Sequence, residues 1–207
     1  MYQLYFAERD TTLYERFPRQ NTGIDQILEL TKIASGSKVD GDIQAITTNT
    51  RFLIDFGAQI TAITTAVNNG TIPPIGTSTN SASIFLNIKA SDANNLPLSY
   101  TLKAFPVSQS WDNGNGTAAD IPETHVGSSW YNRSGDARGT SAIAWNTGSA
   151  PSYNNPGTTE RLGGGAWITG SGYEASQSFQ NQSPDIRMDV TDIVKKWVTN
   201  DIDNNGF

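Results

Sequence analysis

The chain has 207 residues, of which 36% are hydrophobic and 16% charged, and its formal net charge is −6. This length fits one large β-sandwich, and a composition weighted toward Gly, Ser, Thr and Asn favours strands and long polar loops over helices. There is no basic run to neutralise phosphates or to attract an anionic membrane, so we expect neither nucleic acid nor a membrane as partner. The absence of cysteine excludes disulfides and thiolate metal sites.

The N-terminal part is predicted to contain short strands. Tyr2–Phe6 and Thr12–Tyr14 are the opening strands. The apolar run Ile24–Ile33 fits either a helix or an edge strand, and we favour the strand. Residues Gly36–Asn49 are expected to form a loop.

The central part carries clearer periodicity. Arg51–Phe56 is predicted to be a strand, and Ala58–Val67 a short helix that the following Asn-Asn-Gly ends. Ala82–Ala90 alternates strictly, which predicts a strand centred near Leu86. Leu98–Phe105 alternates in the same way, and we expect these two strands to pair across the short loop between them.

The C-terminal part begins with a long polar stretch that Pro and Gly interrupt. Within residues 114–172, each tryptophan is expected to mark a short strand or an anchored loop, because a structureless segment of this length is rare in a compact domain. Ile186–Val190 then alternates as a strand. Thr191 is placed to cap a helix whose apolar face includes Trp197, and this tryptophan is expected to lie in the core.

Seven motifs, taken in order along the chain, resemble those of a known family. They are DTTLYE at Asp10–Glu15, NTGIDQILEL at Asn21–Leu30, NTRFLIDF at Asn49–Phe56, LPLSYTLKAFPVSQSWDNGNGT at Leu96–Thr117, GSSW at Gly127–Trp130, GGGAW at Gly163–Trp167 and DVTDIVKKW at Asp189–Trp197. Their order resembles DNRLRE-type jelly-roll domains, which are related to carbohydrate-binding modules. It is closer still to the version found in virion proteins of tailed phages, marine and cyanophage ones in particular.

The resemblance implies an all-β fold, a jelly-roll β-sandwich with one or two short helices. It also implies a single domain over residues 1–207. In the phage-type proteins the segment similar to Asn204–Phe207 runs into a further strand, so we expect these residues to be the N-terminal part of a longer protein. No catalytic residues are carried over by the resemblance.

Tryptophans in the polar loops are candidates for binding sugars. Trp111, Trp130 and Trp145 would stack on sugar rings if they were exposed. The alternative, which we favour, is that these indoles close the ends of the sandwich beneath the loops.

Acid–base catalysis has little support in the sequence. His125 is the only histidine, which excludes a two-histidine metal site, and it is expected to be a loop residue. Asp112, Asp120 and Glu123 could form a glycosidase pair only if their carboxyl groups met in a cleft. We therefore expect a protein that is not an enzyme.

One short acidic segment resembles half of a calcium loop. Asp201, Asp203 and Asn205 occupy alternate positions, as oxygen ligands do in an EF-hand. The alternative is a turn that ends the preceding helix, which we favour, and no cofactor is expected. A calcium ion held by Asp112 and Asp120 is a further alternative.

These observations predict a structural component of a tailed-phage virion, in the tail, the neck or a fibre-like appendage. Its expected location is the virion, assembled in the host cytoplasm. The expected partners are other virion proteins and further copies of the same chain. The alternative function is a carbohydrate-binding module that attaches the particle to a host-surface glycan.

Overall fold

The computed structural model describes residues 2–39, 42–76, 78–93, 96–146, 163–180 and 184–207, with the backbone alone for 33–39 and 42–48. The chain clusters into two compact units. Unit 1 comprises residues 1–6, 56–108 and 167–207, and unit 2 comprises residues 7–55 and 109–166. The single jelly-roll domain stays a prediction.

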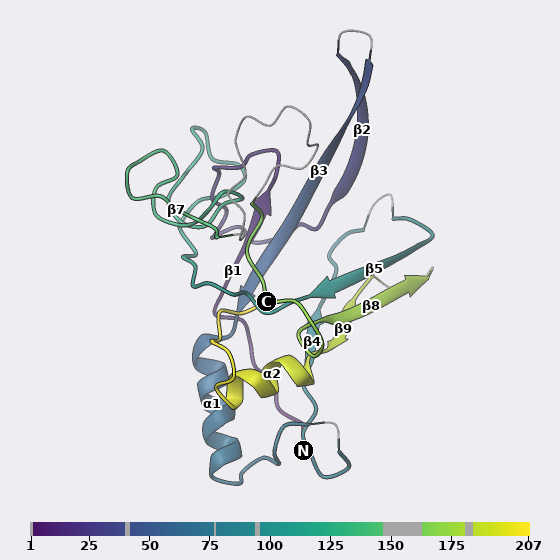
Figure 1. Cartoon of the computed structure of the whole chain (residues 1–207), viewed down its shortest axis with the longest axis vertical. Coiled ribbons are helices and arrows are strands. Elements are labelled where there is room, and N and C mark those ends of the chain that lie inside the picture. The colour runs from purple at the N-terminus through teal and green to yellow at the C-terminus, as the bar shows by residue number, and fades with distance from the viewer. Residues whose placement is uncertain (1, 40–41, 77, 94–95, 147–162, 181–183) are drawn as a thin grey trace. The chain divides into compact units, whose positions relative to one another are not determined.

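Unit 2 is built on a three-stranded antiparallel sheet (Figure 1). Its strands are β1 (Arg9–Tyr14), β2 (Lys32–Val39) and β3 (Asp42–Asp55), in the order β1-β3-β2. The strands β6 (Asn132–Ser134) and β7 (Ile143–Ala144) form a small second pair within the long polar stretch. Residues 147–162 of that stretch lie outside the described residues, so its predicted strands are confirmed only in this part.

Two predictions for the sequence between β1 and β3 are wrong. The expected loop Gly36–Asn49 belongs to a hairpin, in which Ala34 pairs with Thr47 and Lys38 with Ile43. Small residues in the first strand suggested a loop, but pairing with the Ile- and Thr-rich second strand outweighs their low β propensity. The expected strand Ile24–Ile33 is mostly irregular, and only its last two residues enter β2. Before β1, the expected strand Tyr2–Phe6 forms no ladder with the described residues.

The described residues of unit 1 form two pairs of antiparallel strands and two helices. These are β4 (Phe85–Ile88) with β9 (Ile186–Asp189), β5 (Ser99–Ala104) with β8 (Ala175–Gln180), α1 (Gly57–Asn68) and α2 (Thr191–Val198). The strands around Leu86 and Leu102 are confirmed, but their expected pairing is wrong. Leu86 lies opposite Met188, and both are buried, because the two strands match each other's apolar alternation.

Both predicted helices are confirmed, with one correction at a cap. Asn69 is the C-cap of α1, and Gly70 follows with a φ of 74°, a conformation that glycine adopts without strain. The N-cap of α2 is Val190, whereas Thr191 is the first helical residue. The Thr191 hydroxyl accepts a hydrogen bond of 2.9 Å from the backbone N–H of Ile84, so it ties the helix to the segment before β4 instead of capping.

The two helices pack into one apolar core with the strands of unit 1. Ile193, Val194 and Trp197 of α2 are buried there, as the helical spacing predicted. Neither helix that the structure describes is long and apolar enough to span a bilayer. The fold is therefore made mostly of strands in small antiparallel sheets, with two short helices, in agreement with the all-β prediction.

Candidate functional site

The polar loops of unit 2 converge on one buried asparagine. The Asn21 side chain donates hydrogen bonds to the backbone oxygens of Asn113 (2.7 Å) and Ser128 (2.8 Å), and its oxygen accepts from the N–H groups of Gly23 (3.2 Å) and Gly116 (2.8 Å). We call this set of five residues the Asn21 junction. Because every polar atom of the amide is used, the junction fixes two separate loop segments to the turn that follows β1.

Glycine is required where the loops meet this junction. Gly114 has a φ of 80°, and a Cβ there would overlap the Asn21 side chain and the Val126 carbonyl. Gly127 has a φ of 111°, and a Cβ there would lie 2.5 Å from the Cα of Gly114. The Gly-rich bend after Trp111 is thus a packing requirement of the junction.

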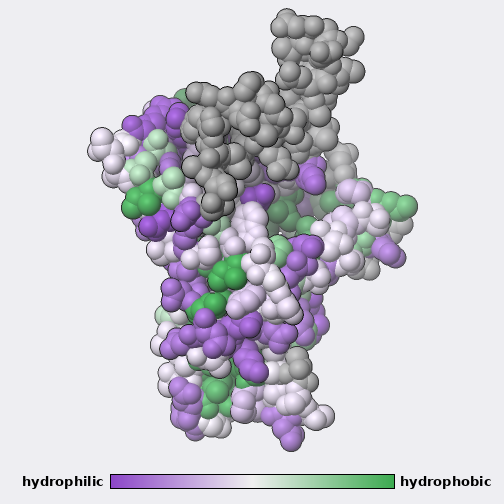
Figure 2. Space-filling model, viewed as in Figure 1, coloured by the Kyte–Doolittle hydropathy of each residue, from purple (hydrophilic) through white to green (hydrophobic). Residues whose placement is uncertain are grey.

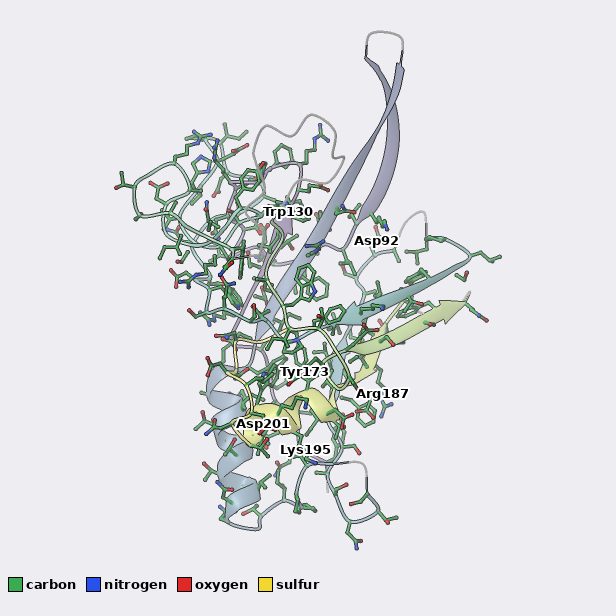
Figure 3. The ribbon with its side chains drawn as sticks, in the orientation of Figure 1. Asp92, Trp130, Tyr173, Arg187, Lys195 and Asp201 are labelled. Carbon is green, nitrogen blue, oxygen red and sulfur yellow. The ribbon has the colours of Figure 1, made fainter. Side chains whose placement is uncertain are left out.

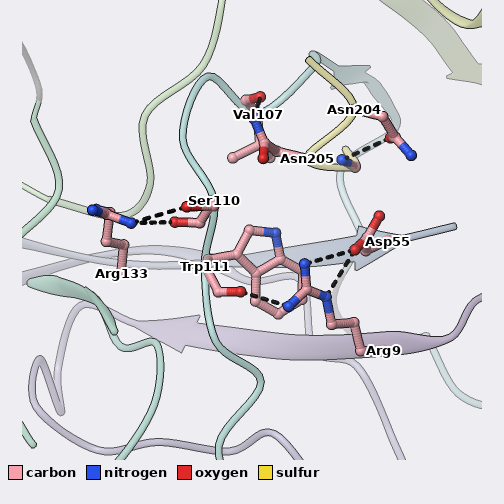
Figure 4. A network of polar contacts seen from close by, with 9 residues as sticks. Arg9, Asp55, Val107, Ser110, Trp111, Arg133, Asn204 and Asn205 are labelled. Carbon is pink, nitrogen blue, oxygen red and sulfur yellow. Dashed lines mark hydrogen bonds and ion pairs between the residues drawn. The ribbon is translucent and has the colours of Figure 1, made fainter. Parts of the chain in front are cut away.

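The first of the three candidate tryptophans is covered by an arginine. Trp111 is 2% exposed, and the Arg9 guanidinium carbon lies 4.5 Å from the centre of its ring. Figure 4 shows the same guanidinium group bonded to the Trp111 carbonyl oxygen (2.6 Å) and to the Asp55 carboxylate (2.7 Å). Asp55 is itself buried, so the ion pair and the ring form part of the interior.

The other two candidates are buried in a similar way. Trp130 is 2% exposed, with the Arg51 guanidinium carbon 5.0 Å from its ring centre, and Trp145 is 6% exposed. The indole N–H of Trp145 donates a hydrogen bond of 2.9 Å to the Ser129 carbonyl oxygen. Figure 3 labels Trp130 among the side chains of this unit. Rings this deeply buried offer no face on which a sugar could stack, so the three tryptophans are not sugar-binding residues in this structure. Their burial agrees with the alternative, in which the indoles close the interior beneath the loops.

Two of the three candidate carboxylates of the long loop, Asp120 and Glu123, have partners of their own. Asp120 accepts hydrogen bonds from the Thr117 N–H and hydroxyl and from the Thr124 hydroxyl. The hydrogen bond from Thr124 and then those from Thr117 lower the pKa of Asp120. Glu123 lies 3.7 Å from Arg138 as an ion pair. A carboxylate whose pKa is lowered in this way is poorly suited to act as a general acid.

His125 lies in a loop, as expected. Its Nδ1 is 3.1 Å from the Arg19 carbonyl oxygen. This contact holds the segment before Val126 against the turn after β1, which is a structural role.

In the segment that resembles half of a calcium loop, Asp201 and Asn205 make hydrogen bonds within the protein. Figure 3 shows Asp201 beside the end of α2, where it accepts a hydrogen bond of 2.9 Å from the Thr199 hydroxyl. The Asn205 amide donates to the Val107 carbonyl oxygen at 3.4 Å, and Asp203 is exposed. Asn200 has a φ of 58° and ends the helix, as the alternative predicted. Within the described part of the chain, no group of three or more His, Asp or Glu side chains is arranged to hold a metal ion.

Sequence reasoning missed a group of acids around Tyr14. Burial, followed by the negative charge of Glu29, raises the pKa of the Tyr14 phenol. Burial also raises the pKa of Asp25, and the charges of Glu29 and Asp120 add to that effect. The Asp25 carboxylate also accepts a hydrogen bond of 3.0 Å from the Ala118 N–H, and this bond acts in the opposite direction by lowering the pKa of Asp25.

We predict that Asp25→Asn raises the melting temperature at neutral pH. A folded-state pKa above the unfolded value of 3.8 means that the charged form costs stability at every pH above the folded-state pKa. The cost disappears as the pH falls through the folded-state pKa to the unfolded one, so the gain should vanish near pH 4. Thermal melts at the two pH values measure it, with the exposed Asp203→Asn as control. A lower melting temperature at neutral pH would show that the hydrogen bond from Ala118 to a full negative charge outweighs the cost of burying that charge near Glu29 and Asp120.

The second feature that sequence reasoning missed is where β3 changes partner. Residues 50–55 of β3 pair with β1, whereas residues 42–49 pair with β2. Figure 1 shows this β2–β3 ribbon, residues 32–39 and 42–49, running on past the end of β1. We call it the β2–β3 arm. In the described structure it is a two-stranded ribbon, with no third strand on either edge.

The base of the β2–β3 arm is firmly held. The buried Glu15 carboxylate accepts hydrogen bonds from the backbone N–H (2.8 Å) and the side-chain amide (2.9 Å) of Asn49. The Thr50 hydroxyl donates to the Glu29 carbonyl oxygen (2.9 Å) and accepts from the Thr31 N–H (2.6 Å). The base of the arm is therefore fixed to the rest of unit 2.

Comparisons with known proteins give no relative. No protein-family model matches the chain, and searches of curated proteins and of solved structures find no match either.

Proposed function

We propose that the chain is a structural component of a tailed-phage virion, with a jelly-roll fold and a place in the tail, the neck or a fibre-like appendage. It acts through contacts with neighbouring subunits and not through catalysis. The resemblance of its ordered motifs to those of phage virion proteins supports a role in the virion. The β2–β3 arm is the observation that best supports contacts with neighbouring subunits as its mode of action.

A two-stranded ribbon gains stability when another chain pairs with it or covers it. An isolated pair of strands is marginally stable in water, because its backbone edges and both of its faces remain solvated. Among the described residues, the arm is such a pair of strands, and Glu15 and Thr50 hold only its base at Asn49 and Thr31. A neighbouring subunit that pairs with or covers the arm would stabilise it, and a fixed base would set the direction in which that subunit attaches.

The buried tryptophans direct the proposal away from glycan attachment. A carbohydrate-binding surface uses exposed aromatic faces, whereas Trp111, Trp130 and Trp145 are covered. These residues instead fill the interior of the unit that bears the arm.

The proposal predicts that removing the arm abolishes incorporation into particles while the chain still folds. In the variant, Asn-Gly joins Lys32 directly to Asn49, which leaves the Glu15 contacts at the base intact. Phage lacking the gene would be complemented with either form, and incorporation would be measured by mass spectrometry and immunogold labelling of purified particles. Circular dichroism of the purified variant checks its fold.

The control is Asn87→Ala, an exposed position on β4. We expect it to enter particles at the wild-type level. Absence of the wild-type chain from purified particles would contradict the virion role itself. Wild-type incorporation of the armless variant would leave the virion role standing and contradict the role of the arm.

A further inference from the structure

The sequence contains four Asn-Gly dipeptides, all of them among the described residues, and the structure holds them differently. In this dipeptide the backbone nitrogen of the glycine can attack the side-chain carbonyl carbon of the asparagine, because no Cβ blocks its approach. The attack requires rotation of the backbone between the two residues, so the local structure decides which dipeptides can react. The four are Asn69-Gly70, Asn113-Gly114, Asn115-Gly116 and Asn205-Gly206.

The two dipeptides of unit 2 are held by the Asn21 junction. The Asn113 side chain donates a hydrogen bond to the Gly23 carbonyl oxygen, and the Asn113 carbonyl oxygen accepts one of 2.7 Å from Asn21. Asn115 is exposed, but Gly116 is buried, and its N–H donates a hydrogen bond of 2.8 Å to the Asn21 side-chain oxygen. In both dipeptides, rotation would therefore open the junction.

The last dipeptide along the chain, in unit 1, is held on both sides. The buried Gly206 accepts a hydrogen bond of 2.9 Å from the Val107 N–H, and its own N–H donates one of 3.2 Å to the Asn204 side chain. The Asn205 amide donates to the Val107 carbonyl oxygen at 3.4 Å. Rotation between Asn205 and Gly206 would break these contacts with a distant segment of the chain.

The remaining dipeptide, Asn69-Gly70, is exposed at the end of α1. Figure 2 shows hydrophilic surface where this helix ends, at the lower left of the view. A Cβ on Gly70 would meet nothing within 4 Å. The Gly70 N–H donates to the Val67 carbonyl oxygen (3.1 Å), and the ψ of Asn69 is 3°. The attack needs both to change, which costs little because the last turn of a helix frays.

The Asn69 side chain is already folded over the glycine. Its oxygen accepts hydrogen bonds from the backbone N–H (3.0 Å) and from the hydroxyl of Thr71, two residues further along the chain. The turn that the first of these bonds closes places the side-chain amide against the Gly70 peptide. Two donors on one oxygen also draw electrons from its carbon, which makes that carbon more reactive toward a nucleophile.

From these contrasts we propose that Asn69 is a site of spontaneous deamidation in the folded chain, whereas the other three dipeptides are protected. The Gly70 nitrogen bonds to the Asn69 side-chain carbonyl carbon, the bond from that carbon to Nδ2 breaks, and the proton of the Gly70 nitrogen leaves with Nδ2 as ammonia. The product is a cyclic succinimide. Water then adds to either imide carbonyl carbon and breaks its bond to the nitrogen, which gives aspartate or isoaspartate.

Deamidation is expected to weaken the end of α1. Residues 56–88 carry no charged side chain, and the reaction introduces a carboxylate where the helix carbonyls already carry partial negative charge. Isoaspartate also adds one carbon to the backbone shortly before Ile72, which packs against the core of unit 1. The reaction needs only the chain and water, so it is independent of the virion role.

Tandem mass spectrometry of the purified chain, incubated in mildly alkaline buffer and sampled over time, tests the proposal. We expect deamidation at Asn69 to be at least about tenfold faster than at the other three sites while the chain is folded. The matched control is the same chain in urea, where all four dipeptides should react at similar rates because the fold no longer distinguishes them. Equal rates at Asn69 and Asn115 in the folded chain would overturn the proposal, since both asparagines are exposed. No reaction at Asn69 would overturn it as well.

Variants at the same position connect the reaction with stability. Asn69→Gln keeps an amide there, but its longer side chain forms a cyclic intermediate far more slowly. We expect the melting temperature of the wild type, followed by circular dichroism, to fall as the chain ages and that of Asn69→Gln to stay constant. Asn69→Asp should show the lower value at once, whereas Asn80→Asp, an exposed position in the same uncharged stretch, should not. An equal fall in the wild type and in Asn69→Gln would contradict deamidation at Asn69 as its cause.

Discussion

Asn21→Ala should destabilise the chain by about 3–5 kcal/mol, because it removes the side-chain partner of four backbone groups, three of them buried and one half-buried. The amide bonds the carbonyl oxygens of Asn113 and Ser128 and the N–H groups of Gly23 and Gly116, and the residue is fully buried. Alanine replaces none of these bonds. Urea unfolding followed by circular dichroism measures the loss, and hydrogen exchange should show its local effect at the Gly116 amide.

Asn21→Asp separates hydrogen bonding from packing. The carboxylate has almost the shape of the amide, but it cannot donate to the two carbonyl oxygens that Asn21 Nδ2 reaches. We therefore expect a large loss at neutral pH for this variant too. The control is Asn87→Ala, which removes an exposed asparagine whose amide donates to the Phe85 carbonyl oxygen, and it should cost less than about 0.5 kcal/mol. A loss at Asn21→Ala no larger than that of the control would contradict the role of the junction.

Local periodicity was sufficient for part of the fold. The alternation of Leu98–Phe105 predicted β5, and the helical spacing of Ile193, Val194 and Trp197 predicted α2 and its buried face. In each case the signal lies within about ten residues, and the element buries the face that the pattern marks.

Pairing between distant strands could not be predicted in that way. β4 and β9 lie about 100 residues apart, and many alternating strands could match Leu86 as well as Met188 does. The nearest alternating strand was therefore expected to be the partner, because short connections are the commonest. The structure shows instead that β5 pairs with β8, whose residues also lie far along the chain.

The hairpin of β2 and β3 did carry a local signal, which the small residues around Gly36 obscured. Asp40 and Gly41 follow β2 in the sequence, and Asp-Gly between two possible strands is a strong hairpin signal. Read together with the β-branched residues that follow, this dipeptide would have predicted the arm.

The burial of the candidate tryptophans could not be predicted from the sequence, for a different reason. An indole's exposure depends on what covers it, and Arg9 and Arg51 cover Trp111 and Trp130 from about 80 to 100 residues away. Asn21 has the same character, since it bonds groups at positions 113, 116 and 128. A buried asparagine of this kind has no sequence pattern of its own, apart from the glycines that its close neighbours require.

Trp197→Ala should cost about 3–5 kcal/mol, because it opens a large cavity in the core of unit 1. The indole is 3% exposed and meets Phe207 edge to face, with ring centres 4.7 Å apart. Phe207 in turn meets Phe56 at 6.3 Å, so the cavity would loosen a chain of three aromatic rings. Urea unfolding followed by circular dichroism measures the change without relying on tryptophan fluorescence.

Trp197→Phe should cost much less than the alanine variant, for two reasons. Phenylalanine keeps most of the apolar contact, and the indole N–H that it removes is buried without a hydrogen-bond partner in the described structure. Trp167→Ala is the matched control, because that ring is 38% exposed, and we expect a loss of about 1 kcal/mol or less. Equal losses at Trp197→Phe and Trp197→Ala would show that the indole N–H is bonded in solution and that its loss, not the cavity, sets the cost.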